Sequence, residues 1–274
     1  MSRTLTLALV QIDIKIGDLA ANLHHVLTLT ADVASQGGQF VVFPELALTG
    51  YHQELLGSKL IELALTPEDE PIQRLAKAAK DFHVHLVVGF IERRTIPGVV
   101  YNSIVTCDPN GQVLGTYAKS HLFATEKLHF RPGASLEVYA TEGKLVGPMI
   151  CMDIGYPEVA RIICLQGAEF LFAPSAWIRE DEDLWPLHLR ARALDNLVFV
   201  AGINRVGVED NLHFIGQSMV VNPRGHVIGQ LGEAEDCLIT TIDLDDVALA
   251  RRKAMQWTGR RPELYGQVAD LLRN

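Results

Sequence analysis

Short apolar runs alternate with amphipathic stretches along most of the chain. The apolar runs predict buried strands, and the stretches between them repeat apolar residues every three or four positions, as helices do. In residues 69–82, for example, Ile72, Leu75, Ala76 and Ala79 fall on one helical face. The pattern predicts strands at residues 5–12, 40–43, 85–92, 101–107, 113–119, 145–151, 170–173, 199–204, 216–222, 227–230 and 237–243. It predicts helices at residues 18–35, 69–82, 157–166 and 184–196.

Turn-forming segments separate several of these elements. The sequences Asp-Pro-Asn-Gly at 108–111 and Asn-Pro-Arg-Gly at 222–225 predict hairpins. No linker, repeat or low-complexity stretch interrupts the alternation, so we expect a single α/β domain over residues 1–274, with layered sheets and helices. Residues 245–274 are charged and helix-like, and we interpret them as a peripheral tail that packs on a neighbouring molecule.

Composition excludes several classes of partner. The net charge is −9 and the sequence pI is about 5.6, which argues against binding nucleic acid or an anionic membrane surface. No segment approaches the roughly 18 uninterrupted apolar residues of a membrane span. The first apolar stretch is short and lacks an Ala-x-Ala-like cleavage site, so it predicts a strand and not a signal peptide. We therefore expect a cytoplasmic protein.

The four cysteines carry information about redox chemistry and metals. Cys107, Cys151, Cys164 and Cys237 are scattered, without a C-x-x-C pair or histidines at zinc spacing. A disulfide framework is not expected in a chain of 274 residues that we expect to be cytoplasmic. His83 and His85 share one face of a strand, but no third ligand is identifiable. We expect neither a metal nor a cofactor.

Three side chains that could take part in catalysis lie at positions where predicted buried strands end. Glu45 follows Phe-Val-Val-Phe-Pro, Lys119 ends the 113–119 strand, and Cys151 ends the 145–151 strand. Taken singly, the first two read as solvated loop residues and the cysteine as a small core residue. Together they form a reactive set, because a carboxylate can accept the thiol proton and an ammonium can stabilise the thiolate and an oxyanion.

The segment 151–155 leads from a strand straight into a helix. This arrangement is mechanically similar to the nucleophile elbow of serine hydrolases. It exposes the sulfur and offers the backbone N–H of Met152 as an oxyanion donor. The combination predicts a thiol hydrolase.

The chain resembles the nitrilase, or carbon–nitrogen hydrolase, superfamily over nearly its whole length. The motifs that carry the resemblance are FPELALTGY at 43–51, YNS at 101–103, KSHLF at 119–123, Glu126 with FRPG at 130–133, ICMDIGYPE at 150–158, GAE at 167–169, PSAW at 174–177, RALDN at 192–196 and NRVG at 204–207. The resemblance implies a four-layer αββα sandwich that dimerises with its C-terminal segment at the interface.

The resemblance also implies roles for individual residues. Glu45 would be the general base, Lys119 the oxyanion stabiliser and Cys151 the nucleophile. Glu126 matches a second glutamate that orients Lys119 or the substrate amide nitrogen. Tyr51, Asn102, Met152 and Trp177 match positions of the substrate pocket, whereas His121 is interpreted as a structural hydrogen-bonding residue.

The expected reaction is hydrolysis of a small linear amide to an acid and ammonia through a cysteine thioester. Positions 154 and 155 are Ile and Gly, and relatives that bind substrate carboxylates often carry Arg there. This lowers the expectation of an ω-amidase, and Met152-Asp153 lowers that of a nitrilase. The acidic run at 180–183 suggests an N-carbamoyl-amine amidohydrolase as an alternative, while Arg179 is the one candidate for binding a carboxylate. An inactive binding member of the same fold is the non-enzymatic alternative.

Overall fold

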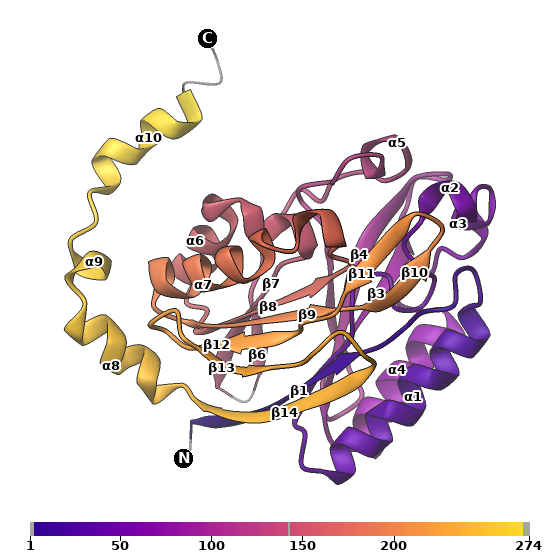
Figure 1. Ribbon diagram of the computed structural model, residues 1–274, viewed down its shortest axis with the longest axis horizontal. Helices are drawn as coiled ribbons and strands as arrows, with labels where there is room; N and C mark the ends of the chain where they lie inside the picture. The colour runs from indigo at the N-terminus through magenta and orange to yellow at the C-terminus, as the bar shows by residue number, and fades with distance from the viewer. Residues whose placement is uncertain (1–2, 142, 271–274) are drawn as a thin grey trace.

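The computed structural model describes residues 3–141 and 143–270, and within them two six-stranded sheets form the centre of the molecule (Figure 1). The first sheet has the order β14 (Asp236–Asp243), β1 (Thr4–Gln11), β2 (Phe40–Val42), β3 (His85–Arg93), β4 (Val100–Cys107) and β5 (Val113–Ala118). The second has the order β13 (Val227–Gln230), β12 (Met219–Val221), β9 (Phe199–Asn204), β8 (Phe170–Ser175), β7 (Lys144–Pro148) and β6 (Tyr139–Thr141).

Each sheet has a parallel centre and antiparallel edges. Strands β1, β2 and β3 are parallel in the first sheet, as are β7, β8 and β9 in the second. Strands of parallel sheets are covered on both faces, which explains why the sequence shows continuous apolar runs at these places. The carboxyl ends of parallel strands lie at one edge of a sheet, where binding sites form in such folds.

Two pairs of helices cover the outer faces of the sheets (Figure 1). Helices α1 (Leu19–Ser35) and α4 (Glu70–Asp81) pack on the first sheet, and α6 (Pro157–Leu165) and α7 (Leu184–Asn196) pack on the second. The side chain of Asp18 caps α1 by accepting the N–H of Ala21 at 3.1 Å. Pro157 begins α6, where its missing N–H costs nothing.

The inner faces of the two sheets share one apolar core. The ring of Phe40 on β2 meets Phe170 edge-on, with the ring centroids 5.6 Å apart, and Phe172 at 5.3 Å. A separate core lies between the first sheet and helices α1 and α4, where Val26 and Leu75 pack with strand residues. The layers are therefore helix, sheet, sheet and helix, and the predicted α/β sandwich is confirmed.

Several local features differ from the sequence-based expectation. Strand β7 ends at Pro148, and Cys151 instead begins the 3₁₀ turn η1 (Cys151–Gly155). The strand expected at 216–222 is limited to the three residues of β12. Elements that were not expected are α2 (Gln53–Leu56), α3 (Lys59–Glu62), α5 (Glu126–His129), η2 (Arg179–Asp181), β6, and the hairpin β10 (Val206–Glu209) with β11 (Leu212–Ile215).

The C-terminal segment forms an arm along the outside of α6 and α7 (Figure 1). It contains α8 (Asp245–Lys253), α9 (Met255–Thr258) and α10 (Pro262–Asp270). Trp257 already has contacts within its own chain, because the guanidinium groups of Arg161 and Arg251 lie 5.4 and 4.0 Å from its ring centroid. Leu264 and Val268 on α10 are exposed. None of the helices in the described part of the chain is long and apolar enough to cross a membrane.

Candidate active site

Glu45 lies in the turn after β2, between the two sheets. The chain can pass close over β3 here because residue 89 is glycine, since a Cβ at Gly89 would lie 2.4 Å from both Leu46 N and Pro44 O. Leu48 N donates to the carbonyl of Gly89 at 3.1 Å and fixes this path. The Glu45 side chain is fully buried as a result.

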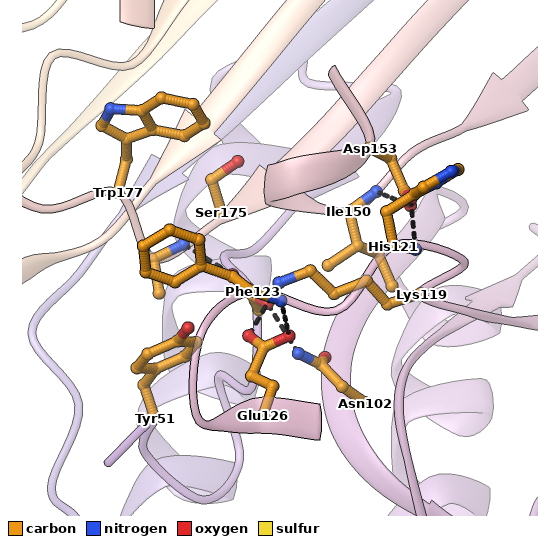
Figure 2. A network of polar contacts seen from close by, with 12 residues as sticks. Tyr51, Asn102, Lys119, His121, Phe123, Glu126, Ile150, Asp153, Ser175 and Trp177 are labelled. Carbon is orange, nitrogen blue, oxygen red and sulfur yellow. Dashed lines mark hydrogen bonds and ion pairs between the residues drawn. The ribbon is translucent and has the colours of Figure 1, made fainter. Parts of the chain in front are cut away.

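Lys119 follows β5 in the same sheet and is also fully buried. Its backbone N–H donates to Asn102 O and its carbonyl accepts from Gly133 N, both at 2.8 Å. Its side-chain nitrogen lies 2.7 Å from Glu45 Oε1 and 2.7 Å from Glu126 Oε1. The ammonium therefore bridges two buried carboxylates, and Figure 2 shows its contact with Glu126.

Further donors hold the two carboxylates in place. Asn102 Nδ2 donates to Glu45 Oε1 at 2.6 Å, and Ala176 N donates to Glu45 Oε2 at 2.8 Å. Phe123 N donates to Glu126 Oε2 at 3.0 Å. Every carboxylate oxygen thus has a partner, as buried charges require.

Burial and mutual charge change the proton affinity of this group. Burial raises the pKa of Glu45, the ammonium of Lys119 opposes this, and the negative charge of Glu126 adds to it. Burial works against the charge of Lys119, but Glu126 and Glu45 outweigh it and raise the Lys119 pKa well above normal. Lys119 therefore stays protonated, while Glu45 holds a proton more readily than an ordinary glutamate.

Cys151 is the first residue of η1 and has a left-handed backbone, with φ of +44°. This region is uncommon for a residue with a side chain and is typical of strained positions at functional sites. The pKa of Cys151 is raised well above its usual value by burial and by the charge of Glu45, against the effect of Lys119. The sulfur is therefore a thiol at neutral pH and reacts only when a base accepts its proton.

A small pocket opens beside Cys151, with a cavity volume of about 100 Å³. Most of its wall is apolar, and His188 and Asp181 are its polar residues. The full lining consists of Phe123, Cys151, Met152, Ala176, Trp177, Ile178, Asp181, Leu184 and His188. No Lys or Arg is among these lining residues, so within the described structure a substrate anion would find no counter-charge in the wall.

The structure separates the four predicted substrate-binding residues into two groups. Met152 and Trp177 line the pocket, and the indole Nε1 of Trp177 donates to Asp181 O at 2.7 Å. Asn102 and Tyr51 lie behind it, where Asn102 contacts Glu45 and Tyr51 lies beside Glu126 (Figure 2). Burial and the charge of Glu126 raise the pKa of the Tyr51 hydroxyl, which therefore keeps its proton.

Arg179 and the acidic run play a smaller part in the pocket than the sequence suggests. Arg179 pairs with Glu182 at 2.9 Å and with Glu233 at 2.6 Å, and it is absent from the pocket lining. Of residues 180–183, only Asp181 reaches the pocket. Phe123 and His188 line the pocket without having been expected there. Residues 3–141 and 143–270 contain no group of three His, Cys, Asp or Glu side chains arranged to hold a metal ion.

Comparison with known proteins decides the family. The sequence profile described as carbon-nitrogen hydrolase matches residues 6–252. The chain belongs to the carbon–nitrogen hydrolase family. It is 33% identical over 267 residues to a probable nitrilase of Schizosaccharomyces pombe, which covers 96% of this chain and 97% of that protein.

Solved structures of carbon–nitrogen hydrolases have the same fold. The crystal structure of a carbon-nitrogen hydrolase from Helicobacter pylori G27 superimposes with a TM-score of 0.90 at 27% identity, covering 97% of this chain and 98% of that one. A mutant of the amidase from Nesterenkonia sp. AN1, a member of the nitrilase superfamily, superimposes with a TM-score of 0.81 at 27% identity, covering 92% of this chain and 95% of that one. That structure shows covalent addition of the acetamide moiety of fluoroacetamide at the active-site cysteine of the amidase.

Proposed function

We propose that this carbon–nitrogen hydrolase cleaves a small linear amide to a carboxylic acid and ammonia through a thioester on Cys151. The observation that carries the proposal is the buried Glu45–Lys119–Glu126 chain beside a cysteine that lines a small apolar pocket. The charges of Glu45 and Lys119 both act on the sulfur of Cys151. The covalent cysteine adduct of the Nesterenkonia amidase supports the same role for the cysteine here.

In the first half-reaction, Glu45 accepts the thiol proton while the sulfur of Cys151 bonds to the substrate carbonyl carbon. Because burial raises the pKa of the thiol, the sulfur needs Glu45 to accept its proton in order to attack. The carbonyl oxygen becomes an oxyanion, which the ammonium of Lys119 and the backbone N–H of Met152 stabilise. Glu45 then donates the proton to the amide nitrogen, and the C–N bond breaks. Ammonia departs, and the acyl group remains bound to Cys151 as a thioester.

In the second half-reaction, Glu45 accepts a proton from water as the water oxygen bonds to the thioester carbon. The C–S bond then breaks, and the sulfur of Cys151 recovers the proton from Glu45. A carboxyl whose pKa is raised suits both directions of transfer, because acid–base catalysts work best when their pKa is near the operating pH.

The substrate that fits the pocket best is an uncharged amide without a carboxylate. An unpaired carboxylate in a dry pocket costs several kcal/mol. The wall provides no cationic side chain among the described residues, and Arg179 is paired with two glutamates outside it. This disfavours an ω-amide acid as the preferred substrate.

An N-carbamoyl amine is the second candidate, because Asp181 is part of the pocket wall. A terminal ammonium on the substrate would be attracted to this carboxylate, as it would not be in a wholly apolar pocket. The two candidates share the proton transfers of Glu45 but differ at the reacting carbonyl. With an N-carbamoyl amine, loss of ammonia leaves a thiocarbamate on Cys151. Water then releases a carbamic acid, which loses CO₂ to give the amine.

A substrate panel tests the proposal. Ammonia release is measured with a short aliphatic amide, its ω-carboxylate analogue, an N-carbamoyl diamine and the corresponding nitrile. We expect the neutral amide to have the highest kcat/KM. A preference for the carbamoyl diamine would favour the second candidate, and a preference for the nitrile would favour a nitrilase. No ammonia from any of the four compounds would favour an inactive binding member of the fold.

A further inference from the structure

We propose that Asp153 is a positioning residue that fixes the turn carrying Cys151 against the loop that follows Lys119. Asp153 lies in η1, two residues after Cys151, and its side chain is fully buried. It touches neither the pocket nor the Glu45–Lys119–Glu126 chain in the described structure. The inference rests on the proposed function, since it concerns the placement of the proposed nucleophile.

The Asp153 carboxylate accepts hydrogen bonds from two segments of the chain (Figure 2). Oδ2 accepts the backbone N–H of Ile150 at 3.0 Å, directly before Cys151, and the hydroxyl of Tyr117 at 2.8 Å. Oδ1 accepts the hydroxyl of Ser120 at 2.7 Å and the backbone N–H of His121 at 2.9 Å. One side chain thus joins the strand-to-turn junction of the second sheet to the loop that leaves β5 in the first.

Both joined segments carry parts of the candidate active site. On one side, the anchored Ile150 precedes the left-handed backbone of Cys151, a conformation that persists only when its surroundings hold it. On the other side, the loop from Ser120 continues to Phe123, which lines the pocket and donates its N–H to Glu126. We call the hydrogen bonds of Asp153 to these two segments the clamp. A shift of the clamp would move the sulfur relative to both Lys119 and the pocket wall.

The clamp needs a carboxylate and not merely a polar side chain. Each oxygen accepts one backbone N–H, from Ile150 or from His121. Asparagine has a single carbonyl oxygen, so its NH₂ group would face one of these N–H donors in either orientation. His121 is the only candidate ion-pair partner of Asp153 among the described residues, with Nδ1 at 3.1 Å from Oδ1. The hydrogen-bond donors therefore compensate for most of the cost of burying this group.

The test replaces Asp153 by asparagine and compares the variant with a matched control. Asp153→Asn should lower kcat by roughly tenfold to a hundredfold, because misplacing reacting groups by about 1 Å has effects of this size. KM should stay within about threefold, since Asp153 itself does not line the pocket. The KM-against-kcat split is measured by ammonia release, together with the melting temperature.

Glu92→Gln is the control, because it makes the same chemical change at another buried carboxylate. Glu92 accepts Ser103 Oγ and Thr116 Oγ1 at 2.7 Å and Arg94 at 2.8 Å, and it belongs to no part of the site. We expect Glu92→Gln to lower the melting temperature while kcat stays within about threefold of wild type. Equal losses of kcat in the two variants would show that activity only follows stability, and would overturn the positioning role.

A second measurement does not depend on the substrate. Iodoacetamide should modify Cys151 more slowly in Asp153→Asn, because the misplaced thiol no longer transfers its proton readily to Glu45. An unchanged or faster rate would overturn the inference. If wild type releases no ammonia but this rate still falls, the proposed function fails and the positioning role stands. Should Asp153→Asn not fold, Asp153→Glu keeps the charge but moves the oxygens, and wild-type kcat in that variant would equally overturn it.

Discussion

The side-chain nitrogen of Lys119 lies 2.7 Å from Oε1 of Glu126, and both side chains are fully buried. Glu126 therefore acts on two groups at once. Its charge helps to keep Lys119 protonated, and it also raises the pKa of Glu45 on the other side of the ammonium. A second glutamate in this position tunes the proposed base without contacting the sulfur through any hydrogen bond.

The first prediction concerns the pH dependence of the wild-type protein. Glu45 acts as a base, so activity is present above its pKa and lost as the pH falls through it. Burial raises that pKa, and the acid limb of kcat/KM should lie above the value of about 4.3 that an unperturbed glutamate has. A pH profile of ammonia release measures it, and an acid limb at or below that value would contradict the assignment of Glu45.

The second prediction concerns Glu126→Gln. Removing this negative charge should lower the pKa of Glu45 and move the acid limb to lower pH, with kcat reduced by roughly tenfold to a hundredfold as Lys119 loses an anchor. Glu263→Gln changes an exposed glutamate far along the arm and serves as the control. If the acid limb of Glu126→Gln stays where it is in wild type, the two carboxylates are not coupled in the way described.

The third prediction concerns the nucleophile. Cys151→Ala should fold normally and retain less than about one per cent of the wild-type rate of ammonia release. Loss of a nucleophile typically lowers kcat by much more than about a hundredfold. Cys164→Ala is the matched control, because Cys164 is a buried thiol on α6 whose pKa burial raises to about 12. Full activity in Cys151→Ala would exclude a thioester mechanism.

The fourth prediction concerns the distal group of the substrate. A neutral amide should have a kcat/KM at least tenfold above its ω-carboxylate analogue, a difference of about 1.4 kcal/mol in transition-state binding. Arg179→Ala should leave this ratio unchanged, because Glu182 and Glu233 already engage the guanidinium. A carboxylate preference that disappears in Arg179→Ala would show that Arg179 turns into the pocket when substrate binds.

The fifth prediction concerns assembly. We expect a homodimer in which the arm of α8, α9 and α10 contacts the partner, because Leu264 and Val268 expose apolar surface on α10. Trp257 should contribute less than its size suggests, since Arg161 and Arg251 already cover it within the chain. Light scattering at micromolar concentration measures the mass, and a monomer would contradict the prediction.

The sequence predicts the layers of the fold better than its connections. Strands buried on both faces leave continuous apolar runs, which is why β1, β3 and β9 are predicted close to their observed bounds. The hairpin of β10 and β11 is not predicted, although Asp210-Asn211 joins its strands and Asp210 has a left-handed φ of +54°. That dipeptide is a turn signal of the kind that marks hairpins.

The same limit applies to the candidate site. Glu45, Lys119 and Cys151 are candidates from the sequence because each follows an apolar run and lies in a motif of the family. His188 is not, because on helix α7 it looks like any polar residue of a half-exposed helix, and only the packing of α7 brings it to the pocket. The same is true of Asp153, whose clamp joins two segments that lie 33 residues apart in the chain.

The candidate site draws on both sheets, with Glu45 and Lys119 after strands of the first and Cys151 after a strand of the second. Neither half of the chain alone can therefore contain a working set of groups. During refolding, ammonia release should return only when the two sheets dock, later than the recovery of helical and strand signals in circular dichroism. The return of ammonia release would therefore report that the two sheets have docked.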